Sequence, residues 1–471
     1  MREIIGERVE KQTIMGMERI YMLETTKILS QYVENLKFNH LTEQDLRYTR
    51  MLILDYFAAS CGGKKLNRVF NEAIESIFFD MGGSPESTVL FSKQKLPAQS
   101  AAILNATYAH GADMDDGHKR AMGHVGAHVF SAVFALAETL QVTEQEVMEA
   151  IVAGYEVYIR ISAAAQPGLA RRGFHSTGTA GGIACAAACA KLLKLDAVGI
   201  HHAMAIGATQ GSGLLIVAES GQMVKPINPA KAAQTGILSA LLAQRGVIGA
   251  AYPLESKKGW FHAMADQIDE SMIIKGLGER NEISQCYLKP YPSCRHTHCG
   301  IEGAVRIYGR NKGKQVSKVN LYIYQSAIQI AGQITHPETD DDAKFSIHYT
   351  LACALAHGGF GLDDLNMACV GAEVNDLIDK INLIHDPDME NRERGIRGAR
   401  IQVLFADGTV DEETIPVPKG DPEVPFTLDD MRKKLSACCK DFLDEKGQNH
   451  LVERVLEFGR GRQFTYATLI G

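Results

Sequence analysis

The sequence predicts a mainly α-helical protein, with a large helical domain formed by both chain ends and a smaller α+β domain that contains an antiparallel sheet. Two observations predict this fold class. Alanine and glycine are plentiful while aromatic residues make up only 7% of the 471 residues, a mix typical of closely packed helices. Apolar residues also alternate along two short stretches late in the chain, which is a strand pattern. We therefore assign residues 1–284 and 421–471 to the helical domain and residues 285–420 to the α+β domain.

The first long helix has a start signal and a stop signal. Thr42 followed three residues later by Asp45 resembles a capping box, in which each residue satisfies a backbone N–H group of the other. The apolar run 51–59 follows, and Gly62-Gly63 is a natural helix stop. The later elements of the helical domain are a short strand at 87–91 and helices at 129–140, from 143 onward, at 196–210 and at 229–244.

The α+β domain is predicted from alternating apolar residues. They occupy positions 319, 321 and 323 and positions 401, 403 and 405, and a turn at Asp407-Gly408 leads into a return run that ends at Ile415. Helical stretches at 300–308 and 346–356 intervene. The break PVPKGDPEVP ends this domain, and the last fifty residues are helical again, so we expect them to return to the first domain.

Composition and charge limit the classes of function that the protein can have. A formal charge of −7 and a pI near 6.2 give no sign of a surface for nucleic acid or for an anionic membrane. No stretch offers about twenty apolar residues for a membrane span, and the charged N-terminus MREIIGERVEKQTIMGMERIYML lacks the apolar region of a secretory signal. The ten cysteines are scattered through apolar stretches and indicate reduced thiols, so we expect a cytoplasmic protein.

The stretch NATYAHGADMDDGHKRAMGHVGAH, residues 105–128, concentrates titratable groups between two apolar runs. It contains Asp113, Asp115 and Asp116 together with His110, His118, His124 and His128. Crowded carboxylates repel one another unless cations or hydrogen bonds hold them. Three interpretations stay open at this point: a solvated acidic loop, a set of metal ligands, or acid, base and orienting groups of an enzyme.

Two further stretches carry polar residues beside helices. In GFHSTGTAGG, His175, Ser176, Thr177 and Thr179 precede a Gly- and Ala-rich helix whose N-terminus would favour an anion, although a simple N-cap is an equally good interpretation. Lys225 precedes the helix at 229–244. A lysine at the entrance to a helical core can bind a carboxylate.

The stretch KPYPSCRHTHCG, residues 289–300, opens the α+β domain. Its Cys294, His296, His298 and Cys299 do not form the two separated ligand pairs of a structural zinc site. If the α+β domain covers the helical domain, Lys289, Arg295 and the histidines face the acidic cluster across a cleft.

Seven blocks together resemble the MmgE/PrpD family, in order and in spacing. They are NATYAHGADMDDGH, GHVGA, GYEVYIRI, GFHSTGTAGG, Lys225 with the following AKAA, KPYPSC, and DAKFSIHYTLACAL, and the resemblance covers about residues 25–465. That family contains 2-methylcitrate dehydratases, cis-aconitate decarboxylases and iminodisuccinate epimerases. The resemblance implies an all-helical domain built from both chain ends, an α+β lid and a homodimer, with no metal or other cofactor in catalysis.

The resemblance also implies site residues. The catalytic set is Asp113 of the D-x-D-D motif, His124, His175, Lys225 and Lys289, and the substrate-binding positions are Thr177, Arg295, Cys294, Gly117 and His118. Two positions depart from the decarboxylase members, which carry Thr where this chain has Gly117 and His where it has Cys294. Both departures remove a polar contact and argue against cis-aconitate decarboxylation.

The implied chemistry is cofactor-independent proton removal next to a carboxylate of a small polycarboxylic acid. Lys225 and Lys289 would hold substrate carboxylates, His124 or His175 would act as base or acid, and Asp113 would orient a histidine. We predict a lyase of the 2-methylcitrate dehydratase type. The alternatives are an epimerase of a dicarboxylate such as iminodisuccinate, then a cis-aconitate-type decarboxylase. From other classes, a metal-dependent hydrolase would use Asp and His residues between 113 and 124, and a carboxylate-binding protein would lack turnover.

Overall fold

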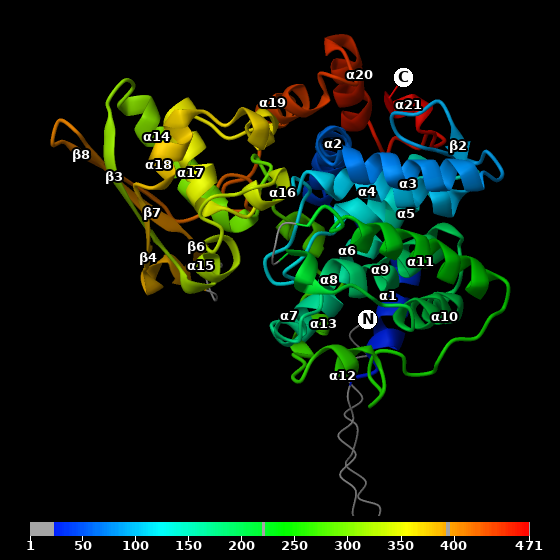
Figure 1. The fold of residues 1–471 in the computed structure, drawn as a ribbon. Coiled ribbons are helices and arrows are strands. Elements are labelled where there is room, and N and C mark those ends of the chain that lie inside the picture. Colours follow the sequence, from blue (N-terminus) through cyan, green and yellow to red (C-terminus); the bar gives the residue numbers. More distant parts are fainter. Residues whose placement is uncertain (1–22, 219–221, 392–395, 471) are drawn as a thin grey trace, which may run out of the picture.

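The chain folds around two hydrophobic cores. The computed structural model describes residues 23–218, 222–391 and 396–470. The first core draws its buried residues from 29–288 and 426–469, apart from Leu362, and we call these segments the helical body. The second core lies within residues 294–415, which we call the lid. Figure 1 shows the lid on the left and the helical body on the right. The predicted fold class, mainly α with a small sheet-containing region, is confirmed.

The helical body contains sixteen of the described α-helices and one short two-stranded sheet. Its N-terminal helices are α1 Thr25–Asn35, α2 Glu43–Leu66, α3 Arg68–Met81, α4 Ala98–Gly111, α5 Gly126–Ala137, α6 Glu144–Ala165, α7 Gly168–Arg171 and α8 Ser176–Thr179. Next come α9 Gly181–Leu192, α10 Ala197–Ala208, α11 Ile227–Gln244, α12 Trp260–Met264 and α13 Ser271–Ile274, and the C-terminal helices are α19 Leu428–Cys439, α20 Glu445–Leu456 and α21 Ala467–Ile470. The strands are β1 Ser87–Thr88 and β2 Lys95–Leu96, so the predicted strand at 87–91 is paired over two residues only.

Helix α2 begins as predicted but does not end as predicted. The Thr42 hydroxyl accepts a hydrogen bond from the Asp45 N–H, which confirms the capping box. The helix continues past Gly62 and Gly63 to Leu66. A Cβ atom on Gly63 would lie 1.9 Å from the carbonyl oxygen of Tyr108 in α4. Glycine therefore serves close contact between α2 and α4 here, and does not terminate the helix.

The Ala- and Gly-rich helix α9 lies at the centre of the helical body. All of its residues are buried, and it packs against α5, α6, α10 and α11. The capping box that begins α6 at Thr143 is confirmed. Helix α5 begins at Gly126, three residues before the predicted start, because the Asp116 carboxylate accepts a hydrogen bond from the Gly126 N–H at 2.7 Å. The acidic cluster thus lies between α4 and α5, fastened at both ends.

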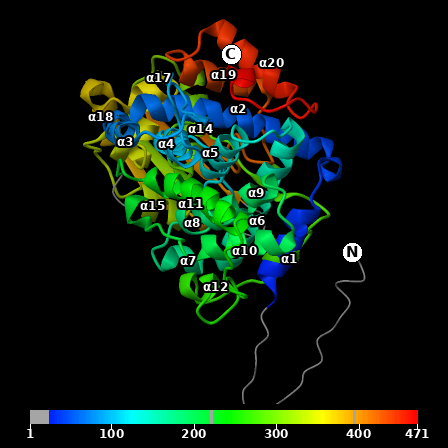
Figure 2. The same ribbon diagram turned by 90° about the vertical axis from the view of Figure 1, so that its right-hand side faces the viewer.

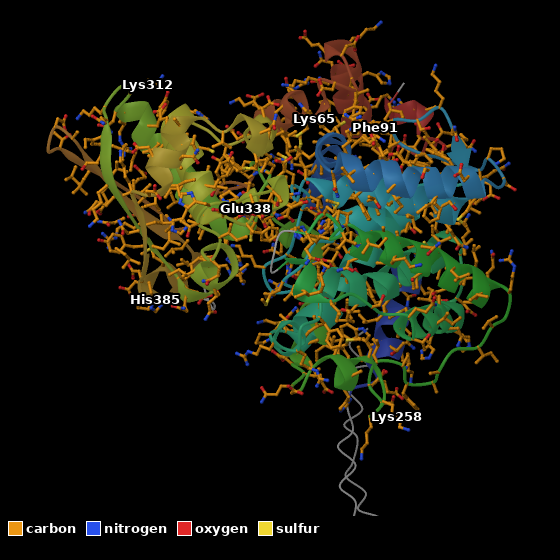
Figure 3. The ribbon with its side chains drawn as sticks, viewed as in Figure 1. Lys65, Phe91, Lys258, Lys312, Glu338 and His385 are labelled. Carbon is orange, nitrogen blue, oxygen red and sulfur yellow. The ribbon has the colours of Figure 1, made fainter. Side chains whose placement is uncertain are left out.

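The lid is a four-stranded sheet with helices. Its elements are α14 His298–Arg310, β3 Val316–Ile323, α15 Gln325–Ala331, α16 Asp340–Ala343, α17 Ile347–His357, α18 Ala372–Ile378, β4 Ile381–His385, β5 Glu390–Asn391, β6 Ile396–Arg397, β7 Ala399–Phe405 and β8 Val410–Ile415. The strand order is β4-β3-β7-β8. Strands β3, β7 and β8 are antiparallel as predicted, but the edge strand β4 runs parallel to β3, so the sheet is mixed. The helical crossover α15–α18 allows this parallel pairing. In Figure 3, Lys312 and His385 mark two ends of the lid and Lys258 the far end of the helical body.

The C-terminal segment returns to the helical body, as expected. Met431 and Leu435 of α19 are buried in the first core, and Lys434 forms an ion pair with Asp55 of α2 at 2.5 Å. Figures 1 and 2 both show α19 and α20 beside α2. The predicted boundaries at 284/285 and 420/421 stay predictions, since Cys286 and Leu288 also pack into the first core.

Among the described residues, no helix combines the length and the apolar character needed to cross a bilayer. Nine cysteines are free and buried, in agreement with the expectation of reduced thiols; they are Cys61, Cys185, Cys189, Cys286, Cys294, Cys299, Cys353, Cys438 and Cys439. The N-terminal stretch in which we expect no secretory signal, residues 1–22, lies outside the described residues.

Burial of His128 in α5 predicts a measurable pH dependence of stability. Neither ring nitrogen has a hydrogen-bond partner among the described residues, and burial lowers the pKa of His128 from 6.5 to about 3. The unfolded chain therefore binds this proton first as the pH falls below about 6.5, and the free energy of unfolding decreases. In the His128→Leu variant this contribution is absent. We therefore expect the free energy of unfolding to fall less steeply with decreasing pH than in the wild type, with the two slopes differing by about 1.4 kcal/mol per pH unit. Urea denaturation at pH 7, 6 and 5 measures the two slopes, and equal slopes would contradict a neutral buried His128.

Candidate active site

Asp113 lies at the centre of a cluster of charged side chains where the lid meets the helical body. Its carboxylate forms ion pairs with Lys225, which precedes α11, at 2.5 Å and with Lys289, which precedes the lid, at 3.3 Å. The Lys289 ammonium group also donates to the Asp113 carbonyl oxygen at 2.7 Å. All three residues are buried. Burial disfavours the charge of Asp113, but the two lysines, together with His124 and His110, more than offset this effect, so the pKa of its carboxyl lies well below the usual value.

His124 lies beside Asp113. Its Nε2 is 3.5 Å from Asp113 Oδ1, and its Nδ1 is 3.0 Å from the carbonyl oxygen of Asp116 and 3.3 Å from Asp115 Oδ1. The backbone N–H of His124 donates to the hydroxyl of Thr177 at 3.1 Å. These contacts hold the imidazole with one nitrogen toward the main chain and the other toward Asp113.

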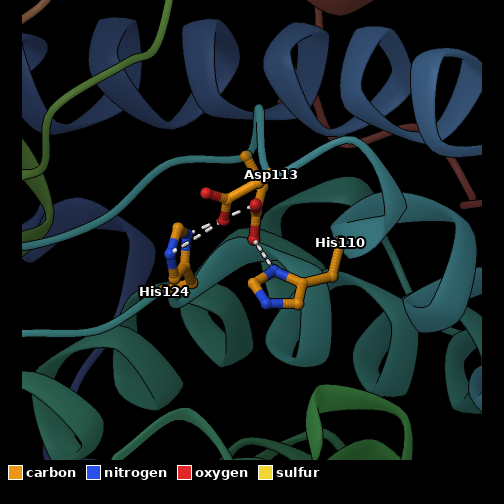
Figure 4. Close-up of side chains that lie close together, drawn as sticks. His110, Asp113 and His124 are labelled. Carbon is orange, nitrogen blue, oxygen red and sulfur yellow. Dashed lines mark hydrogen bonds and ion pairs between the residues drawn. The ribbon is translucent and has the colours of Figure 1, made fainter. Parts of the chain in front are cut away.

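His110 and Asp115 complete the cluster. His110 Nδ1 is 2.8 Å from Asp115 Oδ2, and the His110 ring is 4.7 Å from the His124 ring, centroid to centroid. Figure 4 shows His110, Asp113 and His124 converging, with His110 from the end of α4. Burial lowers the pKa of His110 to about 4, with Asp115 opposing the shift, so this imidazole is neutral near pH 7. We named both residues as part of the acidic cluster but not among the site residues, because their position at the core of the site depends on the fold of the loop.

His175 lies close to His110 of the cluster. Its ring is 6.2 Å from that of His110, and its Nδ1 is 2.9 Å from the Asn228 side-chain nitrogen of α11. Burial, together with the charge of Lys225, holds the pKa of His175 well below its usual value. Asn228 is a contact that sequence reasoning missed, since nothing marks it out within the helix that carries it.

The hydroxyl groups at residues 176 and 177, where we expect an anion site, contact the protein's own backbone. Helix α8 has four residues, and its N-cap is His175. The Ser176 hydroxyl donates to the carbonyl of Met122 at 3.0 Å, while Thr177 accepts from His124. These hydroxyl groups hold the 122–124 segment in place beside the cluster.

Asp116 and His118, both from the 105–128 stretch, have side-chain partners other than Asp113. The Asp116 carboxylate accepts from the Gly126 N–H and from the Tyr155 hydroxyl at 3.0 Å, and burial raises its pKa well above the usual value. The His118 side chain contacts the Ala121 N–H and Glu282. Neither side chain is placed to join a ligand set with Asp113, contrary to the metal-hydrolase interpretation.

The structure brings Cys294 near the cluster and leaves Arg295 outside it. Cys294 is buried, and Asp113 helps burial to raise the pKa of its thiol. The guanidinium of Arg295 pairs with Asp421 at 2.5 Å and donates to the carbonyls of Pro418 and Lys419. Arg295 thus ties the start of the lid to the segment that follows the lid, and its predicted contact with substrate stays a prediction.

Gly117 pairs with Tyr287 through two backbone hydrogen bonds of 2.7 and 3.1 Å. A Cβ atom at Gly117 would lie 2.4 Å from the hydroxyl oxygen of Tyr287. The aromatic ring therefore occupies the place of any side chain at this position. The predicted role of Gly117 in substrate binding stays a prediction, and the position of Tyr287 explains why this residue has no side chain.

Four residues of the cluster could hold a metal ion by distance alone. His110, Asp113, Asp115 and His124 each offer a ligand atom within 4.8 Å of the others. Their charge environment opposes it, because the ammonium groups of Lys225 and Lys289 already neutralise Asp113. At the lid, Cys299 donates to the Arg397 carbonyl, His296 contacts Tyr324, and His298 contacts Arg295, so these side chains have separate partners.

The fold and this cluster are those of a helical enzyme with acid–base groups and lysines at a body–lid junction. The chain belongs to the MmgE/PrpD family, whose N-terminal domain model matches residues 27–271 and whose C-terminal domain model matches residues 291–457. It is 26% identical to a cis-aconitate decarboxylase-like protein, oryM, of Aspergillus oryzae, over 92% of this chain and 94% of that protein. It is also 26% identical to a cis-aconitate decarboxylase of Aspergillus terreus (92% and 93% covered) and 24% identical to the human cis-aconitate decarboxylase (91% of each). With its family and these relatives, the chain is an MmgE/PrpD-type lyase.

Proposed function

We propose that this protein is a cofactor-independent lyase that removes a proton next to a carboxylate of a small polycarboxylic acid, and that it acts as a dehydratase of the 2-methylcitrate type. One observation carries the proposal: the ammonium groups of Lys225 and Lys289 converge on a single buried carboxylate, with the His124 imidazole 3.5 Å from it. The His175 ring lies 6.2 Å from the ring of His110 in the same cluster. Proton removal next to a carboxylate places negative charge on the carboxylate oxygens, and preorganised cations stabilise that charge.

The hydrogen bonds support distinct roles for the two histidines. In the neutral His124 ring, donation from Nδ1–H to the Asp116 carbonyl leaves the lone pair on Nε2, the nitrogen that faces Asp113. His124 Nε2 is therefore the proposed base. His175 Nδ1 accepts from the Asn228 amide, so its Nε2 carries the proton and is the proposed donor to the leaving group. In this proposal Asp113 keeps both lysines in place and shares them with the substrate carboxylate, while the Asp116 carbonyl and Thr177 hold His124.

A second candidate is decarboxylation of cis-aconitate or a similar acid, because the similar proteins of Aspergillus and of human carry that activity in their names. Loss of CO₂ also builds negative charge next to a carboxylate, so the same lysines would serve it. The dehydratase stays the first proposal because the decarboxylase members, by the family resemblance, carry Thr and His where this chain has Gly117 and Cys294. The epimerase and the homodimer stay predictions.

The test is incubation of the chelator-treated protein with 2-methylcitrate, citrate, cis-aconitate and iminodisuccinate in heavy water, followed by NMR. We expect loss of a hydroxyl group with formation of an alkene. Release of CO₂ would establish the decarboxylase instead, and inversion with proton exchange alone would establish the epimerase.

The same experiment tests the metal-dependent alternative. We expect turnover to be unchanged by the chelator, since two lysines supply the positive charge that a metal would supply. Turnover that appears only after a divalent ion is added would contradict the proposal and would assign His110, Asp113, Asp115 and His124 as ligands. Boiled protein is the control for spontaneous reaction.

A further inference from the structure

The backbone of the loop that carries Asp113 has an unusual conformation. Asp113 has a φ of +50°, in the left-handed region that a residue with a side chain rarely adopts. Such a conformation persists only where the surroundings hold it, and it is common at functional sites. The loop begins at Gly111, the last residue of α4, where the helix leaves carbonyl groups without intrahelical partners.

Three buried lysines donate to carbonyl groups on this short stretch. Lys344 of the lid donates to the Gly111 carbonyl at 3.1 Å, and Lys434 of α19 donates to the Met114 carbonyl at 2.7 Å. Lys289 donates to the carbonyl of Asp113 itself. The three come from distant parts of the chain, so the loop is held from the lid and from the C-terminal segment at once.

Each of the two outer lysines has a carboxylate partner that fixes its ammonium group. Lys344 pairs with Asp341 at 2.6 Å, and Lys434 pairs with Asp55 at 2.5 Å. Both lysine side chains are buried, at 8% and 2% exposure. Lysines at the C-terminal end of a helix also complement the negative end of its dipole. Neither residue contacts the Asp113 carboxylate, and neither belongs to the predicted site.

We propose that Lys344 and Lys434 are positioning residues, which hold Asp113 in its left-handed conformation so that its carboxylate meets Lys225, Lys289 and His124. The expected loss of activity rests on the proposed function, whereas the expected change in the conformation of Asp113 does not. Because Lys344 belongs to the lid, the catalytic geometry of the loop forms only when the lid is docked on the helical body.

The test compares Lys344→Met and Lys434→Met with the wild-type protein. In crystal structures of the variants we expect Asp113 to leave the left-handed region. We expect kcat/KM to fall about 10- to 100-fold, the scale of misplacing a catalytic group, with most of the loss in kcat. Lys344→Arg, which keeps a charged donor, should restore most of the activity.

Two matched variants separate positioning from general stability. Lys191→Met removes a buried lysine that donates to the Glu34 and Leu36 carbonyls at the end of α1, far along the chain from the loop. It should lower Tm while kcat/KM stays within about twofold. Asp341→Asn removes the ion pair but keeps the donor to Gly111, and should cost less activity than Lys344→Met.

A folded Lys344→Met protein with normal kcat/KM and an unchanged Asp113 φ would overturn the proposal. If Lys434→Met fails to fold, because Asp55 loses its partner, Lys344→Met alone decides the question. If the wild-type protein turns over none of the acids in the panel, the proposed function fails. The Asp113 conformation in the two variants still tests the positioning role in that case.

Discussion

Replacing Lys225 with alanine should lower kcat/KM at least about a hundredfold, which is the scale of losing one preorganised charge donor. The ammonium group lies 2.5 Å from Asp113 and is buried, so its charge is in position before the substrate binds. The loss should appear both in binding and in turnover, because the substrate carboxylate is held before and during proton removal. Steady-state kinetics measures this loss, with the substrate that the NMR experiment identifies.

Lys231→Ala is the matched control for Lys225→Ala. Lys231 follows Lys225 by six residues, lies in the first part of α11, is exposed, and donates a hydrogen bond to Gln234 of the same helix. Its removal should leave kcat/KM within about twofold. Near-normal activity of a folded Lys225→Ala protein would remove this lysine from the mechanism and leave Lys289 as the cation for the substrate.

His124→Gln should lower kcat by about 10²- to 10⁴-fold, the contribution of general acid–base catalysis. Glutamine can keep the contact with the Asp116 carbonyl but has no basic nitrogen at the position of Nε2. Since the lost step is proton removal, exchange of the substrate proton with heavy water should disappear together with product formation. KM should change much less than kcat, because both lysines remain.

Two comparisons make the His124 result decisive. His262→Gln alters an exposed histidine of α12 and should have no effect on either rate. His175→Ala should abolish product formation while proton exchange persists, if His175 serves only as the donor to the leaving group. Exchange that survives in His124→Gln and is lost in His175→Ala would reverse the two roles.

Local sequence signals were sufficient for much of the fold. The capping boxes at Thr42 and Thr143 and the alternation in β3 and β7 depend on neighbouring residues, so they are visible without a structure. The prediction of a helix stop at Gly62-Gly63 is wrong for the converse reason. Whether a glycine ends a helix or admits a second helix depends on what lies beside it, and α4 lies beside Gly63. The parallel edge strand β4 likewise depends on a long crossover.

The sequence by itself determined the predominance of helix, the return of the C-terminal segment, the family resemblance, and the concentration of Asp and His residues between α4 and α5. Only the tertiary structure decided which of those residues face one another. Side chains within residues 113–118 have different partners: Asp113 pairs with two lysines, Asp116 accepts from the first N–H group of α5, and His118 contacts Glu282. Lys289, Lys344 and Lys434 reach the loop from far along the chain, and such contacts arise from packing of distant elements, which no local pattern encodes.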